Sequence, residues 1–196
     1  KPNTVLNLLH GRYGEDGYIQ AILESENVKY THSGVLSSSL AIDKELSKKI
    51  FIKNKILTPK YVKFSYRNNK NKFKLINSLK KKIGFPLVVK PLNEGSSVNV
   101  YICKKNNVLK ILKKLIEYGE VLLEKYIPGR EIQVAILGGK VLGAIELRPT
   151  RKFYDYEAKY NPKARTEHII PVEMSKNKYQ EVTKIALKAH KILNCR

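Results

Sequence analysis

Short apolar runs alternate with amphipathic stretches along most of this chain, and that alternation limits the folds it can adopt. The run Leu87-Val88-Val89-Lys90-Pro91 has the length and composition of a buried strand, whereas residues 107–118 repeat apolar side chains at helical spacing. Residues 131–137 and 140–147 are two more strand-like runs, and Gly138-Gly139 between them suits a tight hairpin turn. The pattern predicts a mixed α/β (α+β) architecture.

The remaining segments fit the same architecture. The other expected elements, in chain order, are a strand at 4–9, a loop with three glycines at 10–17, a helix with Ile19, Ile22 and Leu23 on one face, one helix from 37–39 to about 54, a short strand at 61–66, a helix that ends at Ile83, a strand at 98–102, a strand at 121–126 and a last helix capped by Ser175. Residues 148–170 are rich in Tyr, Lys and Arg without such periodicity, so we expect an irregular segment there.

Composition limits the class of protein. With 42% hydrophobic and 28% charged residues among 196, the chain is typical of a soluble globular protein. It has no run of 18 apolar residues and no signal-peptide pattern, so we expect neither a membrane span nor export. Cys103 and Cys195 are isolated, which favours a reduced, cytoplasmic setting. Neither end resembles a natural terminus, so we expect an internal piece of a longer protein.

The net charge of +21 raises the hypothesis of nucleic-acid binding. However, seven of the 38 basic residues are arginines and 31 are lysines, and abundant Ile and Asn accompany them. Proteins that read nucleic acids usually rely on arginine forks and stacked aromatic rings. Compositional drift with lysines on solvent-facing helix surfaces is therefore the better interpretation, and nucleic-acid binding stays a remote alternative.

Lys90 lies within the expected strand 87–91, and a buried ammonium is costly unless an anionic group meets it. The loop Asn93–Ser97 that follows supplies small residues, backbone N–H groups and hydroxyls, which are the material of a phosphate cradle. It is not a Walker loop, because GxxxxGK[ST] is absent. An edge lysine that reaches solvent, followed by an ordinary turn, explains these residues equally well.

A second candidate is the end of the strand expected at 121–126, where Glu124 and Lys125 are followed by Ile127 and Glu131. A carboxylate accepts hydrogen bonds from a base amino group or ribose hydroxyls, and lysine meets a ring nitrogen or phosphate. Taken alone, a surface Glu–Lys pair of little energetic value is the better interpretation.

Two loops complete the candidates. His10 has the chemistry of a general base or phosphate ligand, although a histidine that shapes a turn is favoured by itself. Residues 153–160 concentrate tyrosines, which indicates function or packing, while Asp155 and Glu157 argue against RNA stacking. The other histidines have no spacing typical of a metal site or a catalytic site: His32, His168 and His190. No metal ligands are predicted in the chain.

In combination and in this order, these segments resemble the D-alanine–D-alanine ligases, a family of ATP-grasp enzymes. The matching strings are His10-Gly11-Arg12-Tyr13-Gly14-Glu15-Asp16-Gly17, Tyr30-Thr31-His32-Ser33-Gly34-Val35, Ala41-Ile42-Asp43-Lys44, Val89-Lys90-Pro91, Glu94-Gly95-Ser96-Ser97-Val98, Glu124-Lys125-Tyr126 and Tyr154-Asp155-Tyr156-Glu157-Ala158-Lys159-Tyr160. The resemblance covers nearly the whole chain and implies a partial ATP-grasp fold. Its expected parts are the end of an N-terminal parallel-sheet domain at 1–41, a central α+β subdomain at 42–120, and the start of a C-terminal subdomain at 121–196 with a lid loop at 148–170.

The resemblance also implies an activity. ATP would phosphorylate one D-alanine carboxylate, and the amine of a second D-alanine would attack the acyl phosphate, giving a dipeptide for peptidoglycan precursors; Mg²⁺ would bridge the phosphates. The implied ATP contacts are Lys44, Lys90, Glu94, Ser96, Ser97, Glu124, Lys125, Ile127, Glu131 and Lys159. The implied catalytic residues are His10, near the first substrate or the transferred phosphate, and Ser96 and Tyr160, which would share a hydrogen-bond network.

Finally, the resemblance implies a cytoplasmic enzyme that is a homodimer when complete and binds neither membranes nor nucleic acid. The string at 156–160 favours D-alanine over D-lactate as the second substrate. A D-alanine–D-lactate or D-alanine–D-serine ligase and a non-catalytic homologue are the alternatives. His32 and Asn99 stand where the family usually has glycine. The family's magnesium ligands would follow Arg196, so the 196-residue chain alone is predicted to lack ligase activity.

Overall fold

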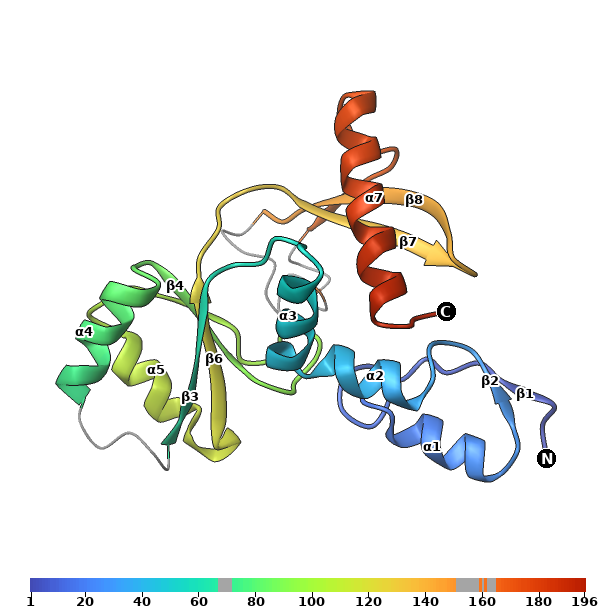
Figure 1. Cartoon of the computed structure of the whole chain (residues 1–196), viewed down its shortest axis with the longest axis horizontal. Coiled ribbons are helices and arrows are strands. Elements are labelled where there is room, and N and C mark those ends of the chain that lie inside the picture. The colour runs from blue at the N-terminus through green and yellow to red at the C-terminus, as the bar shows by residue number, and fades with distance from the viewer. Residues whose placement is uncertain (67–71, 151–158, 160, 162–164) are drawn as a thin grey trace.

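The computed structural model describes residues 1–196 with the exception of 67–71, 151–158, 160 and 162–164, and it contains three separate sheets (Figure 1). The expected mixed architecture is confirmed. Near the N-terminus, β1 (Thr4–Val5) pairs in parallel with β2 (Lys29–Tyr30), and α1 (Tyr18–Ser25) connects them. The other two sheets are antiparallel, and they hold most of the residues of interest.

The central sheet has four strands in the order β3-β6-β4-β5: β3 (Tyr61–Ser65), β6 (Glu120–Lys125), β4 (Leu87–Pro91) and β5 (Tyr101–Cys103). Helices α4 (Lys72–Lys82) and α5 (Val108–Lys114) cover one face, and a short 3₁₀ turn, η2 (Ile116–Tyr118), follows α5 (Figure 1). Alternate side chains of the strands, such as Leu87 and Leu123, pack there against Leu79 and Leu115. Each such fully buried leucine contributes about 1.5–3 kcal/mol, so this face is the core.

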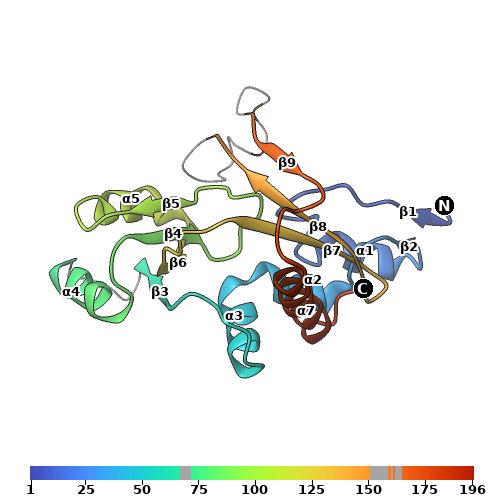
Figure 2. The same cartoon turned by 90° about the horizontal axis from the view of Figure 1, so that it is seen from above.

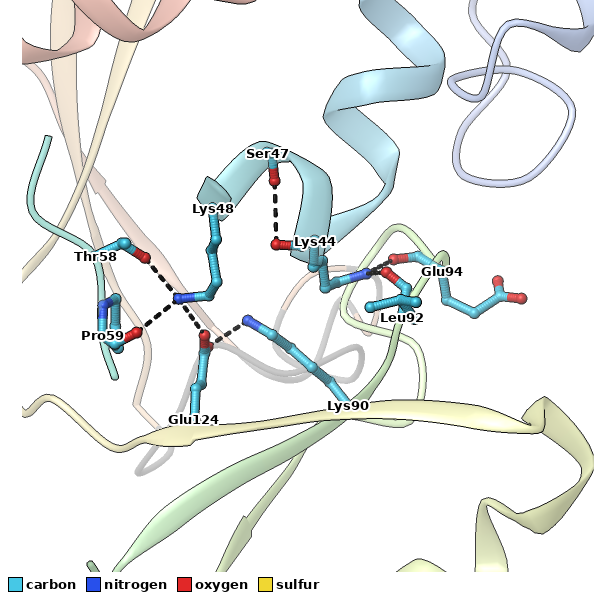
Figure 3. A network of polar contacts seen from close by, with 9 residues as sticks. All are labelled: Lys44, Ser47, Lys48, Thr58, Pro59, Lys90, Leu92, Glu94 and Glu124. Atoms are coloured by element: carbon cyan, nitrogen blue, oxygen red, sulfur yellow. Dashed lines mark hydrogen bonds and ion pairs between the residues drawn. The ribbon is translucent and has the colours of Figure 1, made fainter. Parts of the chain in front are cut away.

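The same alternation directs polar side chains to the opposite face of this sheet. Val88 stands opposite Glu124 in the β4–β6 register, so Lys90, two residues further along β4, points to the same side as Glu124. Helix α3 (Lys44–Lys53) lies over that side (Figure 3). The strand expected at 87–91 is therefore confirmed, and its lysine lies on the face opposite the apolar core.

The single helix expected from 37–39 to about 54 is wrong, because two helices, α2 (Val35–Ile42) and α3, meet at Asp43. Asp43 has extended backbone angles, and its carboxylate accepts the backbone N–H groups of Glu45 and Leu46, both at 2.9 Å. Aspartate is among the residues that best cap a helix N-terminus in this way. The break turns α3 toward the central sheet and sets Lys44 in its first turn.

The strand expected at 4–9 is also wrong beyond Val5. The side chain of Asn7 accepts the backbone N–H of Leu9 at 3.0 Å and donates to the carbonyl of Gly14 at 2.9 Å. Such a local side-chain bond competes with a strand ladder and turns the backbone. The apolar side chains of Leu8 and Leu9 are exposed as a result.

The third sheet has the order β7-β8-β9 and lies beside α7 (Lys176–Ile192), as Figure 2 shows from above: β7 (Glu131–Leu137), β8 (Lys140–Arg148) and β9 (Glu167–Ile169). The predicted hairpin is confirmed, with φ values of +56° and +73° at Gly138 and Gly139. Ser175 caps α7 as expected, accepting the backbone N–H of Lys178. Strand β9 was not expected, since it lies in the stretch 148–170 that has no periodicity.

The strand β6 belongs to the central sheet, where it pairs with both β3 and β4. The expected boundary between residues 120 and 121 had assigned this strand to the following subdomain. Strand β5 also begins later than the expected strand at 98–102, because Asn99 has a positive φ of 54°. Within the described part of the chain, no helix is both long and apolar enough to cross a membrane.

Candidate functional site

A cavity of about 400 Å³ lies on the polar face of the central sheet, between the sheet, the start of α3 and the loop after β4. Eight of the residues singled out from the sequence line it: Lys44, Lys90, Glu94, Ser96, Ser97, Glu124, Lys125 and Ile127. Apolar side chains form part of its wall, among them Val88 and Val100. Residues that are up to 83 positions apart in the chain, from Lys44 to Ile127, thus meet around one space.

A larger depression of about 890 Å³ lies on the other side of the loop after β4. Its lining is rich in carboxylates, including Asp16, Asp43, Glu117 and Glu120. The smaller cavity gathers the lysines and the Gly-Ser-Ser loop, so it is the better candidate for binding an anionic ligand.

The centre of the site is the carboxylate of Glu124, which is 8% exposed and pairs with two lysines (Figure 3). Lys90 from β4 donates to its Oε1, and Lys48 from α3 lies 2.9 Å from its Oε2. Burial alone raises the pKa of this carboxyl, but the charges and hydrogen bonds of Lys90 and Lys48 outweigh it and hold the pKa below its ordinary value. Glu124 is therefore ionised at neutral pH.

Lys44 contacts the backbone that leads into the Gly-Ser-Ser loop. Its Nζ donates to the carbonyl oxygens of Leu92 at 3.1 Å and Glu94 at 2.5 Å, while the carboxylate of Glu94 points away from the lysines (Figure 3). Burial, together with repulsion from Lys90, lowers the pKa of Lys44 to about 8. Two lysine ammonium groups thus stand close together at one end of the cavity, which favours an anion there.

The loop after β4 has an unusual backbone. Ser96, Ser97 and Asn99 have φ values of +50°, +55° and +54°, a region that residues other than glycine rarely adopt. A side chain on Gly95 would lie 2.8 Å from Cα of Gly11, so this loop touches the one that carries His10. Left-handed residues of this kind are frequent at ligand-binding loops, where the surrounding structure holds them.

Asn99 ends the loop after β4 and holds a left-handed backbone there, at a position where the resemblance implies a glycine. Asparagine adopts positive φ more readily than most residues. Its amide nitrogen donates to the hydroxyl of Tyr118 at 2.7 Å, and its amide oxygen accepts the hydroxyl of Tyr101 at 2.9 Å. The end of the loop is therefore fixed to β5 and to η2 by one side chain.

The remaining predicted residues lie around this centre or outside the described residues. His10 directly precedes Gly11, which approaches Gly95. Lys125 donates to the carbonyl of Phe85 at 3.4 Å beneath the cavity wall. Partial burial raises the pKa of Glu131 at the start of β7, and the nearby charge of Lys159 opposes part of that increase. Tyr160 and most of the expected lid fall outside the described residues, so their roles stay predictions.

Lys48 is the residue that sequence reasoning missed. It is 6% exposed, and besides Glu124 its ammonium donates to Oγ1 of Thr58 at 2.6 Å and to the carbonyl of Pro59 at 3.0 Å. One weak signal was present, since Lys44 and Lys48 are one helical turn apart and so share a face of α3. In a chain with 31 lysines that signal does not stand out.

The described residues contain no group of three or more His, Cys, Asp or Glu side chains arranged to hold a metal ion. Cys103 is buried, and burial raises the pKa of its thiol to about 11, so it packs as a small apolar side chain. Within these residues, the polar groups that line the site come from lysines, glutamates, serine hydroxyls and the backbone.

Known proteins resemble this chain in sequence. A family model described as D-ala D-ala ligase C-terminus matches residues 50–196. The chain is 63% identical over 196 residues to the D-alanine–D-alanine ligase of Pelagibacter ubique, covering 100% of this chain and 64% of that protein. The chain therefore spans less than two thirds of the length of this relative.

Solved structures are similar as well. The D-alanine–D-alanine ligase from Bacillus anthracis complexed with ATP matches 98% of this chain and 60% of its own, with 34% identity and a TM-score of 0.79. The VanG D-Ala:D-Ser ligase from Enterococcus faecalis matches 100% of this chain and 57% of its own, with 28% identity and a TM-score of 0.84. Because the family model spans most of the chain and these folds agree, the chain belongs to the D-alanine–D-alanine ligase family and has part of its ATP-grasp fold.

Proposed function

We propose that this chain is part of a cytoplasmic, ATP-dependent ligase that joins two D-alanines through an acyl phosphate, for peptidoglycan precursors. The observation that carries the proposal is the cavity in which Lys44, Lys90 and the Gly-Ser-Ser loop meet Glu124. Phosphoryl transfer needs positive charge and exact positioning more than covalent help from the protein. A site built from lysines and backbone groups suits that need.

The proposed ATP orientation follows from the two ends of the cavity. The ammonium groups of Lys44 and Lys90 and the hydroxyls of Ser96 and Ser97 suit the phosphates. The apolar side chains near Ile127 suit the adenine ring, and the backbone of residues 124–127 offers polar groups at its edge. The similar Bacillus anthracis ligase is known complexed with ATP, which supports this assignment.

The place of the first D-alanine is proposed from the contact between two loops. Because Gly11 approaches Gly95, His10 lies on the loop next to the proposed phosphate site, where an amino-acid carboxylate can meet the transferred phosphate. Tyr160 and Lys159 belong to the proposed lid that would exclude water from the acyl phosphate. ATP usually carries Mg²⁺, but the described residues offer no ligand set for that ion, and no step is assigned to it.

The test is phosphate release by the full-length protein from ATP. We expect release that depends on D-alanine, together with formation of the dipeptide, and no ligase activity from the 196-residue chain alone. Activity that is independent of D-alanine, or absent from a folded full-length protein that binds ATP, contradicts the proposal.

The main alternative within the family is D-serine as the second substrate, since a D-Ala:D-Ser ligase has a similar fold. Competition between D-alanine and D-serine at neutral pH separates the two. We expect D-alanyl-D-alanine as the main product, and a mixed dipeptide in excess would replace our choice of substrate. The proposed homodimer is checked separately by light scattering.

A further inference from the structure

Glu124 forms ion pairs with two lysines in a part of the protein that is little exposed to solvent. The side chains of Lys48 and Glu124 are 8% and 10% exposed, and that of Lys90 is 20% exposed. Figure 3 shows Lys48 reaching the carboxylate from α3 and Lys90 reaching it from β4. One buried carboxylate beside one buried and one partly buried ammonium group leaves an excess positive charge beside the cavity.

The two lysines differ in the other hydrogen bonds that their ammonium groups make. The ammonium of Lys48 donates to Glu124, to Oγ1 of Thr58 and to the carbonyl of Pro59, which accounts for all three of its donors. Its charge also lies 5.2 Å from the centre of the Tyr61 ring. Lys90, within the described part of the chain, has Glu124 as its hydrogen-bond partner, and it lines the cavity.

This difference matters if Lys90 is to contact a phosphate, since its ammonium then either shares its charge between Glu124 and the phosphate or leaves Glu124. A buried carboxylate that loses its last cation is strongly unfavourable. Glu124 keeps Lys48 when Lys90 leaves, so the exchange of one anion for another at Lys90 becomes possible. Without Lys48, Glu124 would hold Lys90 back.

We propose that Lys48 is a positioning residue for nucleotide binding, which keeps Glu124 paired and in place while Lys90 moves from Glu124 to a nucleotide phosphate. The proposal rests on the proposed function, because it requires a phosphate-bearing ligand in this cavity. It assigns no contact between Lys48 and the nucleotide.

The first experiment compares Lys48→Met with Lys49→Met in the full-length protein. Lys49 is the next residue of α3, but its side chain is 57% exposed and pairs with Glu45. We expect Lys48→Met to raise the KM for ATP about tenfold or more, while kcat at saturating ATP changes less than about twofold. Lys49→Met should leave both values unchanged.

A double variant distinguishes positioning from mere support of the residues around Thr58. In Lys48→Met/Glu124→Gln, the neutral amide no longer retains Lys90, so we expect tighter ATP binding by calorimetry than in Lys48→Met alone. If Lys48 only ties Thr58 and Pro59 to α3, the second substitution gives no such recovery. An unchanged KM in Lys48→Met, or no recovery in the double variant, overturns the proposal.

A measurement on the unmodified protein covers the case in which Lys48→Met does not fold. Lysines are acetylated with and without ATP and read by mass spectrometry, with Lys49 as the exposed reference. We expect Lys48 to stay unreactive in both states and ATP to change the reactivity of Lys90. Reactive Lys48 in the presence of ATP overturns the proposal. Absence of ATP binding by the unmodified protein instead rejects the proposed function.

Discussion

Two sheets of this molecule each bury one glutamate between two cations, and the two arrangements differ. In the central sheet, Glu124 pairs with Lys48 and Lys90, and the cavity lies beside it. In the third sheet, Glu146 is 3% exposed and pairs with Arg130 and Arg148, whose side chains are about half exposed. The hydrogen bonds of Arg130, with help from those of Arg148, lower the pKa of Glu146.

The difference lies in the shape of the cations. Arg130 binds Glu146 through Nε at 2.9 Å and Nη2 at 2.5 Å, a two-pronged contact that fixes the relative position of two chain segments. Its Nη2 also donates to the carbonyl of Glu173 at 2.7 Å, which ties the segment before α7 to β8. A lysine ammonium is a compact charge on a flexible stem, so it can change partners. We therefore expect the Glu146 site to act in stability and the Glu124 site to act in binding.

The largest expected effect is on nucleotide affinity when Lys90 loses its charge. Lys90→Met should weaken ATP binding by about a hundredfold, because the proposed contact between its charge and a phosphate is lost. Thermal stability should change little, since Glu124 keeps its bond with Lys48. Calorimetry with ATP and a thermal melt measure the two quantities.

The matched control is Lys125→Met, because Lys125 also lines the cavity but donates to the carbonyl of Phe85. Equal losses from both variants would contradict a special role for Lys90.

The next effect separates the two glutamates by stability. Glu124→Gln leaves the buried ammonium of Lys48 without a counter-charge, which should cost about 3 kcal/mol of unfolding free energy. Glu146→Gln leaves two arginines that water can reach, so a smaller loss is expected. Added ATP should recover part of the stability of Glu124→Gln, since its phosphates can pair with Lys90. Urea unfolding with and without ATP tests this, and the gain that ATP gives the unmodified protein is the reference. A gain above that reference in Glu146→Gln as well as in Glu124→Gln would remove the contrast.

The sequence indicated eight of the residues that line the cavity but not the contacts between them. The run Leu87-Val88-Val89-Lys90-Pro91 indicated a buried strand that carries a lysine, because strand alternation is a local property. The pairing of Lys90 with Glu124 depends on the β4–β6 register, which joins residues 34 positions apart, and no local pattern encodes it. The break at Asp43 was readable from its capping chemistry, yet the apolar periodicity on both sides suggested one helix.

A smaller effect concerns pH, through Lys44. Its pKa of about 8 means that it is charged below that pH and loses its charge as the pH rises through it. ATP affinity should therefore fall above pH 8, by at most about tenfold per pH unit. The free energy of unfolding should change in the opposite direction to the ATP affinity as the pH rises. Between about 8 and the ordinary value of 10.5 the unfolded chain binds more protons at this residue, so unfolding free energy rises with pH. Lys44→Arg, which stays charged, should flatten the affinity profile measured from pH 7 to 9.5.

The smallest expected effect is at Asn99, where a substitution changes the stiffness of the loop after β4 without changing the side chains that line the cavity. Asn99→Gly keeps the positive φ but removes the bonds to Tyr118 and Tyr101. The freed loop must be ordered when ATP binds, so we expect KM for ATP to rise about threefold, with kcat within twofold. Asn99→Ala loses the same bonds and also disfavours the left-handed backbone, so its KM should rise further. Tyr101→Phe removes one of the two bonds and should fall between Asn99→Gly and the unmodified protein. If Asn99→Gly lowers the KM for ATP instead, the two hydrogen bonds of Asn99 hold the loop away from its binding conformation. The lysines of the cavity would then bind ATP without a pre-ordered loop.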